Sequence, residues 1–296
     1  MDFKKYGSIE NAQNQDIIRK IKEQGFYNEE YVVQEKVHGA NVCFITNGKN
    51  IISAKRTAII SADEKFYNLQ ELQKKYETKI IQLFNIISKK VENISQLAVY
   101  GELFGGLYAH PAVLKVKSAT RLQKGIYYSP DNDFYAFDIR INNEQYLDTD
   151  TINGFFEEAE FFYAKTLFRG TLDDCLAYPN EFQSQIAVWL GLPQIENNTC
   201  EGVVIRPVKP LFFKNRARVM LKNKNEKWAE KSNYSARKAK KQKTEKPLPL
   251  SNLAQILLKE ISTYINENRL NSVLSKIGQV SQKDRGKLQG MLGKDA

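Results

Sequence analysis

The sequence predicts an α+β protein in which antiparallel sheets pack against flanking helices. Short runs rich in β-branched and aromatic residues recur along the chain, and turns containing glycine or polar residues separate them. Two of these turns join neighbouring runs as hairpins, whose strands are antiparallel. Residues 68–91 instead carry apolar side chains at helical spacing, which predicts a helix that packs against a sheet.

The first hairpin is predicted around residues 35–41. Residues 31–34 and 42–45 favour strands, and Gly39 lies between them. A corner of this kind would hold Lys36 on a rigid scaffold, and Gly39 would let a ligand approach the backbone. A lysine nucleophile needs a fixed position and a setting that favours the free amine. In isolation the pattern Lys-x-x-Gly is weak, since roughly nine in ten such matches are solvated polar turns.

Other elements follow in order along the chain. A short helix is expected within residues 8–30, where Ile17, Ile18 and Ile21 are the apolar positions. Further strands are predicted at residues 51–57, 97–106, 201–207 and 219–224, and a second hairpin at 125–141 around a Ser-Pro-Asp-Asn turn. Helices are expected from about residue 151 and from about residue 181, the latter with Asn180 as N-cap and an end at Gly191.

The C-terminal part of the chain has a different composition. Residues 235–247 are rich in lysine and poor in apolar side chains, as in a linker or arm. Residues 252–296 have a helical pattern, with one apolar face formed by Leu253, Ile256, Leu257, Ile261 and Ile265. We therefore predict an N-terminal domain over 1–233, a basic linker over 234–250 and a small helical domain over 251–296.

Composition restricts the classes of function. The chain has 296 residues, a net charge of +10 and a pI near 9.2, which favour a polyanionic partner such as nucleic acid. It has no run of ~18 apolar residues that could span a membrane, and its start does not resemble a signal peptide. The three cysteines, Cys43, Cys175 and Cys200, have neither metal-ligand spacing nor a paired arrangement. An intracellular, most simply cytoplasmic, protein is expected.

Five predicted strands carry polar residues at an end. They supply Lys36 and His38, then Lys55 and Arg56, then Glu102, Glu201 and Arg206, and finally Lys222 and Lys224. Each has a simpler explanation alone, such as a rim salt bridge or a solvated strand face, and Phe137 could be a core residue. Together, cations around a lysine suit a triphosphate, carboxylates suit ribose hydroxyls or a divalent metal, and an aromatic ring suits a purine.

In their order, these stretches resemble the motifs of covalent nucleotidyltransferases, the polynucleotide ligases and capping enzymes. Residues 35–39 resemble motif I, 53–57 motif Ia, 100–106 the acidic motif that follows, 134–139 motif III, 201–207 motif IV and 221–224 motif V. The pattern Lys36-x-His38-Gly39-x-Asn41 is similar to the RNA ligase 2 family, which includes the mitochondrial RNA-editing ligases. The resemblance covers roughly residues 30–231.

The resemblance implies a nucleotidyltransferase fold (ATP-grasp-like ligase adenylation fold) with a small helical tail, and a three-step ATP-dependent RNA ligase reaction. Lys36 attacks the α-phosphate of ATP and releases pyrophosphate, AMP moves to a 5′-phosphate RNA end, and a 3′-hydroxyl attacks that end. Mg²⁺ or Mn²⁺ assists. The helical tail, about 50 residues long, is shorter than we expect for the full C-terminal domain of the phage-type members.

The resemblance also assigns roles by motif position. Glu35 and the Val37 backbone contact the adenine edge, Phe137 stacks on its face, and Glu102 holds the ribose. Lys222 and Lys224 hold the α-phosphate. The remaining residues are His38 at the leaving phosphates, Asn41 and Arg56 at the reacting end, Glu201 at the metal, and Arg206 in support of this shell.

Alternatives remain open. One is another covalent nucleotidyltransferase, either a DNA ligase or an mRNA-capping enzyme, and a second is an RNA-binding relative that has lost catalysis. The expected partner is RNA with 3′-OH and 5′-phosphate ends, including a nicked duplex, in RNA repair or processing. The protein is expected to act as a monomer or within a complex. The basic linker and helical tail are expected to engage RNA.

Overall fold

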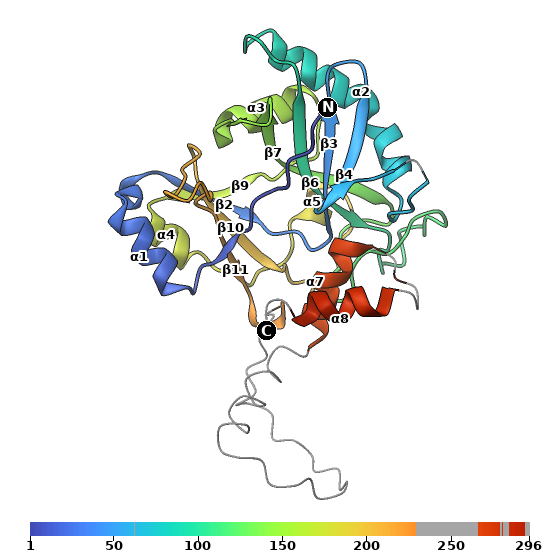
Figure 1. Cartoon of the computed structure of the whole chain (residues 1–296). Coiled ribbons are helices and arrows are strands. Elements are labelled where there is room, and N and C mark those ends of the chain that lie inside the picture. Colours follow the sequence, from blue (N-terminus) through green and yellow to red (C-terminus); the bar gives the residue numbers. More distant parts are fainter. Residues whose placement is uncertain (62, 229–265, 279, 281–283, 294–296) are drawn as a thin grey trace, which may run out of the picture. The chain divides into compact units, whose positions relative to one another are not determined.

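The computed structural model describes residues 1–61, 63–228, 266–278, 280 and 284–293. The chain divides into two compact units, Met1–Asn225 and Glu226–Ala296. The first unit contains two sheets, and every predicted motif lies in it (Figure 1).

The first sheet, sheet A, has five strands. In spatial order they are β1 (Glu10–Asn11), β11 (Leu221–Lys224), β10 (Gly202–Pro207), β2 (Tyr31–Glu35) and β9 (Thr166–Gly170). β1 and β11 run parallel, and the other neighbours are antiparallel. Strand β10 therefore lies between β2 and β11, which brings motif IV between motifs I and V.

The second sheet, sheet B, has six strands, all antiparallel to their neighbours. In spatial order they are β5 (Ala58–Ile59), β4 (Ile51–Lys55), β3 (Ala40–Thr46), β6 (Leu97–Gly105), β7 (Asn132–Ile141) and β8 (Gln145–Tyr146). The predicted antiparallel sheets are thus confirmed.

The predicted hairpin around residues 35–41 is wrong. Strand β2 pairs with β10 and β9 in sheet A, whereas β3 pairs with β4 and β6 in sheet B. The four residues from Lys36 to Gly39 therefore cross from one sheet to the other. Sequence gives strand propensity but not the partner of a strand: β2 pairs with the distant strands β9 and β10, whereas β3 pairs with the next strand, β4, and with β6. As a result, Lys36 lies where the two sheets meet.

Helices cover the outer faces of the two sheets (Figure 1). Against sheet B pack α2 (Leu69–Ser88) and α3 (Thr149–Glu158), whose buried side chains join those of β3, β6 and β7 in one apolar cluster. The predicted stripe on α2 is confirmed, since Leu69, Leu72, Tyr76, Ile80, Leu83 and Ile87 are all buried. Sheet A is covered by α1 (Gln15–Glu23) and α4 (Leu172–Ala177), and a 3-10 turn, η1 (Phe26–Asn28), follows α1.

A third apolar cluster joins the two sheets. It contains Cys43, Ala98 and Tyr100 from sheet B, Met220 beside β11, and Tyr6 from the N-terminal segment, with Phe137 and Val204 packed against it. Apolar contact between sheets is the main source of stability in layered folds of this kind. The cluster therefore fixes the distance between the strands that carry motifs III, IV and V.

The second predicted hairpin is also wrong. Strand β7 is present, but residues 126–128 form no strand, and β7 pairs with β6 and β8 instead. The side-chain amide of Asn198 binds both polar groups of the Tyr127 backbone. It donates to the Tyr127 carbonyl at 2.6 Å and accepts from the Tyr127 N–H at 2.8 Å. This leaves the Tyr128 ring buried beside the Lys36 segment.

The predicted helix over residues 181–191 is mostly wrong. Only α5 (Ile186–Trp189) forms, and the Asn180 side chain donates to Asn223 and to the Lys224 carbonyl instead of capping a helix. Strand β9 and helix α4 were not predicted. Helix α4 begins with a capping box between Thr171 and Asp174, a Thr-x-x-Asp pattern that the sequence does contain.

The second unit contains a 3-10 turn, η2 (Glu226–Trp228), and the helices α7 (Glu267–Ile277) and α8 (Arg285–Gly293). Helical character in the tail is thus confirmed over these ranges. The predicted linker 234–250, the boundary at residue 233 and the apolar face from Leu253 to Ile265 lie outside the described residues. Among the described helices, none has the length and apolarity that a membrane crossing requires.

Candidate active site

The carboxylate of Glu201 is the centre of a buried charge cluster. Its Oε2 lies 2.8 Å from the Lys36 Nζ and 3.5 Å from the His38 Nδ1, and its Oε1 lies 3.0 Å from the Lys224 Nζ. The Glu201 side chain is 1% exposed, and that of Lys36 is 19% exposed. Residues from motifs I, IV and V thus meet around one carboxylate.

Strand pairing explains why these residues meet. In sheet A, β10 pairs Val203 with Glu35 on one side and Gly202 with Lys224 on the other. The ladder continues past β2, because the Lys36 N–H donates to the Gly202 carbonyl at 3.0 Å. The start of β10 and the ends of β2 and β11 therefore lie at one edge of the sheet.

The cluster determines the charge state of Glu201. Burial alone would raise the pKa of this carboxyl, but Lys224, Lys36 and His38 hold the pKa well below its usual value. Glu201 is consequently a carboxylate at neutral pH and a weak base. Its role in this geometry is to hold the cations, above all the Nζ of Lys36, in fixed positions.

Glu102, on β6 of sheet B, lies on the other side of the site from the strands of sheet A that carry the Glu201 cluster. The Gly39 N–H donates to Glu102 Oε1 at 3.1 Å, and Asn41 on β3 is the register partner of Glu102 on β6. Burial raises the pKa of Glu102 to about 7, while Lys36 and Arg56 act to lower it and Glu201 acts to raise it. Glu102 therefore lies within the electrostatic reach of the Glu201 cluster, and Arg56 does so too. Lys55, by contrast, pairs with Glu64.

The structure gives a reason for glycine at position 39 that the sequence did not predict. A Cβ at this position would lie 2.1 Å from the Leu103 carbonyl oxygen, so Gly39 allows the crossing segment to approach β6 closely. Contact with the neighbouring strand therefore requires glycine here, and the approach of a ligand to the Gly39 backbone stays a prediction.

We predict that Gly39→Ala destabilises the first unit by about 1–3 kcal/mol, because the added methyl group would force the backbone of β6 or the crossing segment to move. Urea unfolding measures this cost. Gly154→Ala is the matched control: a Cβ added at this position in α3 would meet no atom within 4 Å, so the change should raise stability by about 0.5–1 kcal/mol. Equal effects of the two changes would contradict this explanation.

Glu35 and Val37, which the family resemblance assigns to the adenine edge, are both buried. The Glu35 carboxylate accepts from the Ser184 hydroxyl at 2.6 Å and from the Gln185 N–H at 2.9 Å. Burial raises the pKa of Glu35 to about 7, although these two hydrogen bonds act to lower it. The structure thus directs Glu35 toward the segment before α5 and away from the Glu201 cluster.

Phe137 and Arg206 connect the two sheets. Phe137 is partly buried in the cluster between them, and its ring centroid lies 5.1 Å from that of Tyr6. Arg206 is 1% exposed; it donates to the Phe137 carbonyl at 2.9 Å and to Asp138 at 3.3 Å. The described contacts of Arg206 are therefore with β7 and not with the Glu201 cluster, and they place it behind Phe137 as a support.

Several residues of this region were missed by the sequence reasoning. Asp138 is fully buried and receives hydrogen bonds from the Tyr6 hydroxyl at 2.6 Å, from Arg206 and from Arg218. Tyr128 accepts from the His38 N–H at 3.0 Å. Asp138 directly follows Phe137 in a strand of apolar residues. A charged residue in such a strand indicates a buried ion pair, so the sequence did contain a signal for Asp138. No local pattern pointed to Tyr6 or Tyr128.

The described residues contain no group of three or more His, Cys, Asp or Glu side chains that could hold a metal ion. Mg²⁺ and Mn²⁺ do not need such a group, because they commonly bind one or two carboxylates together with substrate phosphates. Glu201, with Glu102 nearby, offers that donor set. The residues present therefore fit a divalent metal that arrives with a nucleotide.

Comparisons with known proteins agree with this geometry. A family model described as RNA ligase matches residues 29–224, and one described as T4 RNA ligase 2 C-terminal matches residues 250–296. Mitochondrial RNA-editing ligase 1 of Trypanosoma brucei brucei is 29% identical over all of this chain and 75% of that protein. RNA-editing ligase 2 from the same organism is 32% identical over 69% of this chain and 55% of that protein.

Solved structures support the fold. A variant of Naegleria gruberi RNA ligase matches with a TM-score of 0.50 and 17% identity over 76% of this chain, and another variant, solved with ATP and Mn, matches with a TM-score of 0.50 and 16% identity. The chain spans 57% of the length of each of these proteins. With motifs I, IV and V gathered around Glu201 and both family models matched, this chain belongs to the RNA ligase family, in the ATP-dependent branch that contains RNA ligase 2 and the RNA-editing ligases.

Proposed function

We propose that this chain joins RNA ends through a lysine–AMP intermediate formed on Lys36. One observation carries the proposal: the Lys36 Nζ is held 2.8 Å from a buried carboxylate that also binds Lys224 and His38. This arrangement fixes a nucleophilic amine among cations that can bind a triphosphate.

In the first step, the Lys36 Nζ attacks the α-phosphorus of ATP. A nitrogen–phosphorus bond forms, the bond to the β-phosphate oxygen breaks, and pyrophosphate leaves with its electron pair. Lys36 must react as the free amine, so its ion pair with Glu201 must loosen when ATP binds. Because the pKa of Glu201 lies well below its usual value, Glu201 positions the lysine and the lysine proton passes to solvent.

Lys222 and Lys224 project from the same face of β11, since side chains two residues apart share a face of a strand. The contact of Lys224 with Glu201, the shared-face position of Lys222, and the contact of His38 with Glu201 support roles for the two lysines at the α-phosphate and for His38 at the leaving phosphates. A divalent metal held through Glu201 and the phosphates would add Lewis-acid stabilisation of the developing charge.

The nucleoside would lie between the sheets. Phe137, in the apolar cluster between the sheets, supplies an aromatic face, and the buried Glu35 and the Val37 backbone are the proposed contacts for the adenine edge. Glu102, on the opposite wall, can accept hydrogen bonds from ribose hydroxyls. Arg206 would act through Phe137 by holding its carbonyl.

In the later steps AMP passes to a 5′-phosphate RNA end, and a 3′-hydroxyl displaces AMP to form the phosphodiester. Asn41 and Arg56, near Glu102, are the proposed contacts for the reacting end. Nicked duplex RNA as substrate, action as a monomer or within an RNA-processing complex, and an intracellular and most simply cytoplasmic location are parts of this proposal. Both trypanosome relatives are named as mitochondrial proteins.

Incubation with α-labelled ATP and Mg²⁺, followed by a denaturing gel and mapping of the labelled peptide, tests the proposal. We expect a label on Lys36 that depends on ATP and is not formed from GTP. A GTP-derived adduct would favour a capping enzyme, and sealing of nicked DNA in place of RNA would favour a DNA ligase. Failure of the folded chain to form any adduct would favour a catalytically inactive RNA-binding relative.

We predict that Lys222→Ala and Lys224→Ala each slow lysine–AMP formation by at least about tenfold, because each removes a cation proposed to stabilise charge on the α-phosphate. Thermal stability should change little, since Glu201 keeps Lys36 and His38 as partners. Rates of adduct formation and melting temperatures measure the two effects. A melting-temperature loss that parallels the activity loss would indicate a structural role instead.

A further inference from the structure

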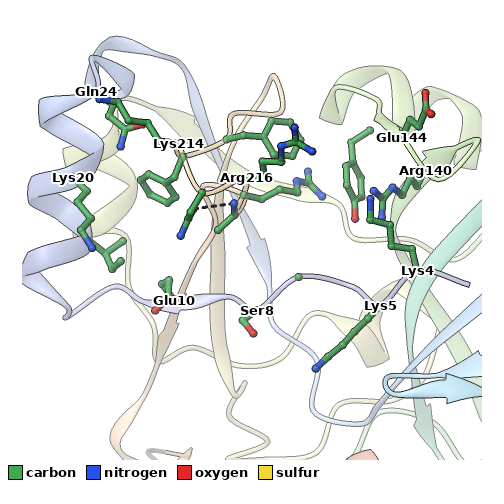
Figure 2. Close-up of a pocket in the computed structure, with 18 residues that line it drawn as sticks. Lys4, Lys5, Ser8, Glu10, Lys20, Gln24, Arg140, Glu144, Lys214 and Arg216 are labelled. Carbon is green, nitrogen blue, oxygen red and sulfur yellow. Dashed lines mark hydrogen bonds between the residues drawn. The ribbon is translucent and has the colours of Figure 1, made fainter.

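A basic groove lies at the end of sheet A that is opposite the Glu201 cluster. Its volume is about 1140 Å³, which exceeds that of most small-molecule pockets. The N-terminal segment, α1, the β7–β8 hairpin and the loop between β10 and β11 line it (Figure 2). Glu201 directly precedes β10, whereas the loop between β10 and β11 follows that strand. At about 3.3 Å per residue, strand β10 separates the groove from the cluster by roughly 20 Å.

The lining of the basic groove is strongly cationic. It includes the cations Lys4, Lys5, Lys20, Arg140, Lys214, Arg216 and Arg218, against the acids Glu10 and Glu144. Arg218 is compensated by Asp138. Within the described part of the chain, no ion pair joins Lys5, Lys20, Lys214 or Arg216 to an acid. Four cations from three separate segments thus line the groove without an ion pair to an acid among the described residues.

Aromatic side chains accompany these cations. Arg140 is 6% exposed, and its guanidinium lies over the Tyr146 ring, 4.9 Å from the ring centroid. Its buried Nε has no hydrogen-bond acceptor among the described residues. Phe212 is 42% exposed, and its ring lies 6.3 Å from that of Tyr146. A large apolar ring therefore faces solvent beside the cations.

We propose that the basic groove binds a single-stranded segment of RNA, away from the ends that are joined. Backbone phosphates would meet Lys214, Arg216 and the lysines opposite, and a base would stack on Phe212. Cations along a groove together with exposed aromatic rings are the features that bind single strands without sequence preference. An acidic peptide would use the charge but not the exposed ring. The proposal rests on the proposed function in that the bound strand belongs to the RNA being sealed.

The test uses the full chain and a fluorescent single-stranded RNA of about 16 nucleotides. Lys214→Glu with Arg216→Glu reverses two exposed charges in the loop. Lys49→Glu with Lys89→Glu is the matched control, since both lysines are exposed, neither lines the groove and the net charge changes equally. We expect the groove pair to weaken binding at least about tenfold more than the control pair. The slope of log K against log salt should fall by about 1.4, because each lost contact contributes roughly 0.7.

Two further measurements make the result decisive. Phe212→Ala should weaken RNA binding by at least about fivefold, while Phe212→Trp should retain it, as stacking requires. Affinity and salt slope of the groove pair equal to those of the control pair would overturn the proposal. The proposal would also be overturned if the groove pair lost binding to a polyglutamate peptide while its RNA binding stayed unchanged. That result would indicate an acidic protein partner.

Lysine–AMP formation, measured on the same proteins, separates this inference from the proposed function. We expect the groove pair to form the adduct at the wild-type rate. If even the wild-type chain forms no adduct while the groove pair still loses RNA, the proposed function fails and the groove remains an RNA site. If the adduct forms normally and RNA binding is unaffected by the groove pair, the groove proposal fails alone.

Discussion

We expect Lys36→Ala to abolish the labelled adduct, with the rate of lysine–AMP formation falling by at least about a thousandfold. Two lysines, Lys36 and Lys224, contact the Glu201 carboxylate, but only Lys36 lies on the segment that crosses between the sheets. That segment is fixed on both sides, by Gly202 in sheet A and by Glu102 in sheet B. Adduct formation with α-labelled ATP measures the loss.

The same variant should still seal RNA that already carries a 5′-adenylate, because that step bypasses the lysine. Retained sealing would show that the fold and the RNA site are intact. Lys224 and His38 remain beside Glu201, so no buried carboxylate is left without a cation. Lys89→Ala serves as the control, because Lys89 is an exposed lysine at the end of α2. This change should leave lysine–AMP formation and the sealing of adenylated RNA unchanged. A label that maps to Lys222 or Lys224 would contradict the assignment.

The motifs could be predicted from sequence because each is a short strand with a polar residue at its end. Such a strand has a local pattern, and the order of the six motifs along the chain is distinctive. The meeting of Lys36, Glu201 and Lys224 was therefore a sound expectation. What sequence could not supply was the partner of each strand. The pairing of β2 with β10, which creates the cluster, links residues more than 160 positions apart.

The same limit explains the errors in the fold. Both predicted hairpins placed runs that are adjacent in the sequence side by side, yet β3 and β7 each pair with β6, which lies between them in the sequence. Residues 126–128 have strand-forming side chains, but the backbone N–H and carbonyl of Tyr127 bind the Asn198 side chain instead of a strand. Long-range hydrogen bonds of this kind leave no local pattern. Periodicity succeeded on α2, where a long amphipathic stripe decides the structure.

Buried polar networks were the least visible part of the site. Asp138 lies within motif III, but its partners Tyr6 and Arg218 lie 132 and 80 residues away. Together with Arg206, they fix β7 against β10 and the loop before β11, directly behind Phe137. The proposed nucleoside pocket is therefore supported by charges that only the three-dimensional arrangement reveals.

Asp138→Asn should lower the free energy of unfolding by about 3–5 kcal/mol, because it leaves the buried guanidinium groups of Arg206 and Arg218 without a compensating charge. The asparagine keeps the shape, so loss of charge is the main change. Urea unfolding at neutral pH measures the effect. Asp16→Asn is the matched control: its pair with Arg19 is exposed, and it should cost less than about 1 kcal/mol. Adding Arg218→Met to Asp138→Asn should recover part of the loss.

The pH dependence of this effect has a definite sign. Burial acts to raise the pKa of Asp138, but Arg206 and Arg218 hold it below the ordinary value of 3.8. A carboxyl with a lowered pKa in the folded state stabilises the protein above its unfolded pKa and loses that contribution as the pH falls. The stability difference between wild type and Asp138→Asn should therefore be constant near neutral pH and shrink below about pH 4. A difference that instead grew with acidification, or a neutral-pH cost no larger than that of Asp16→Asn, would mean that Asp138 does not hold the two sheets together through its charge.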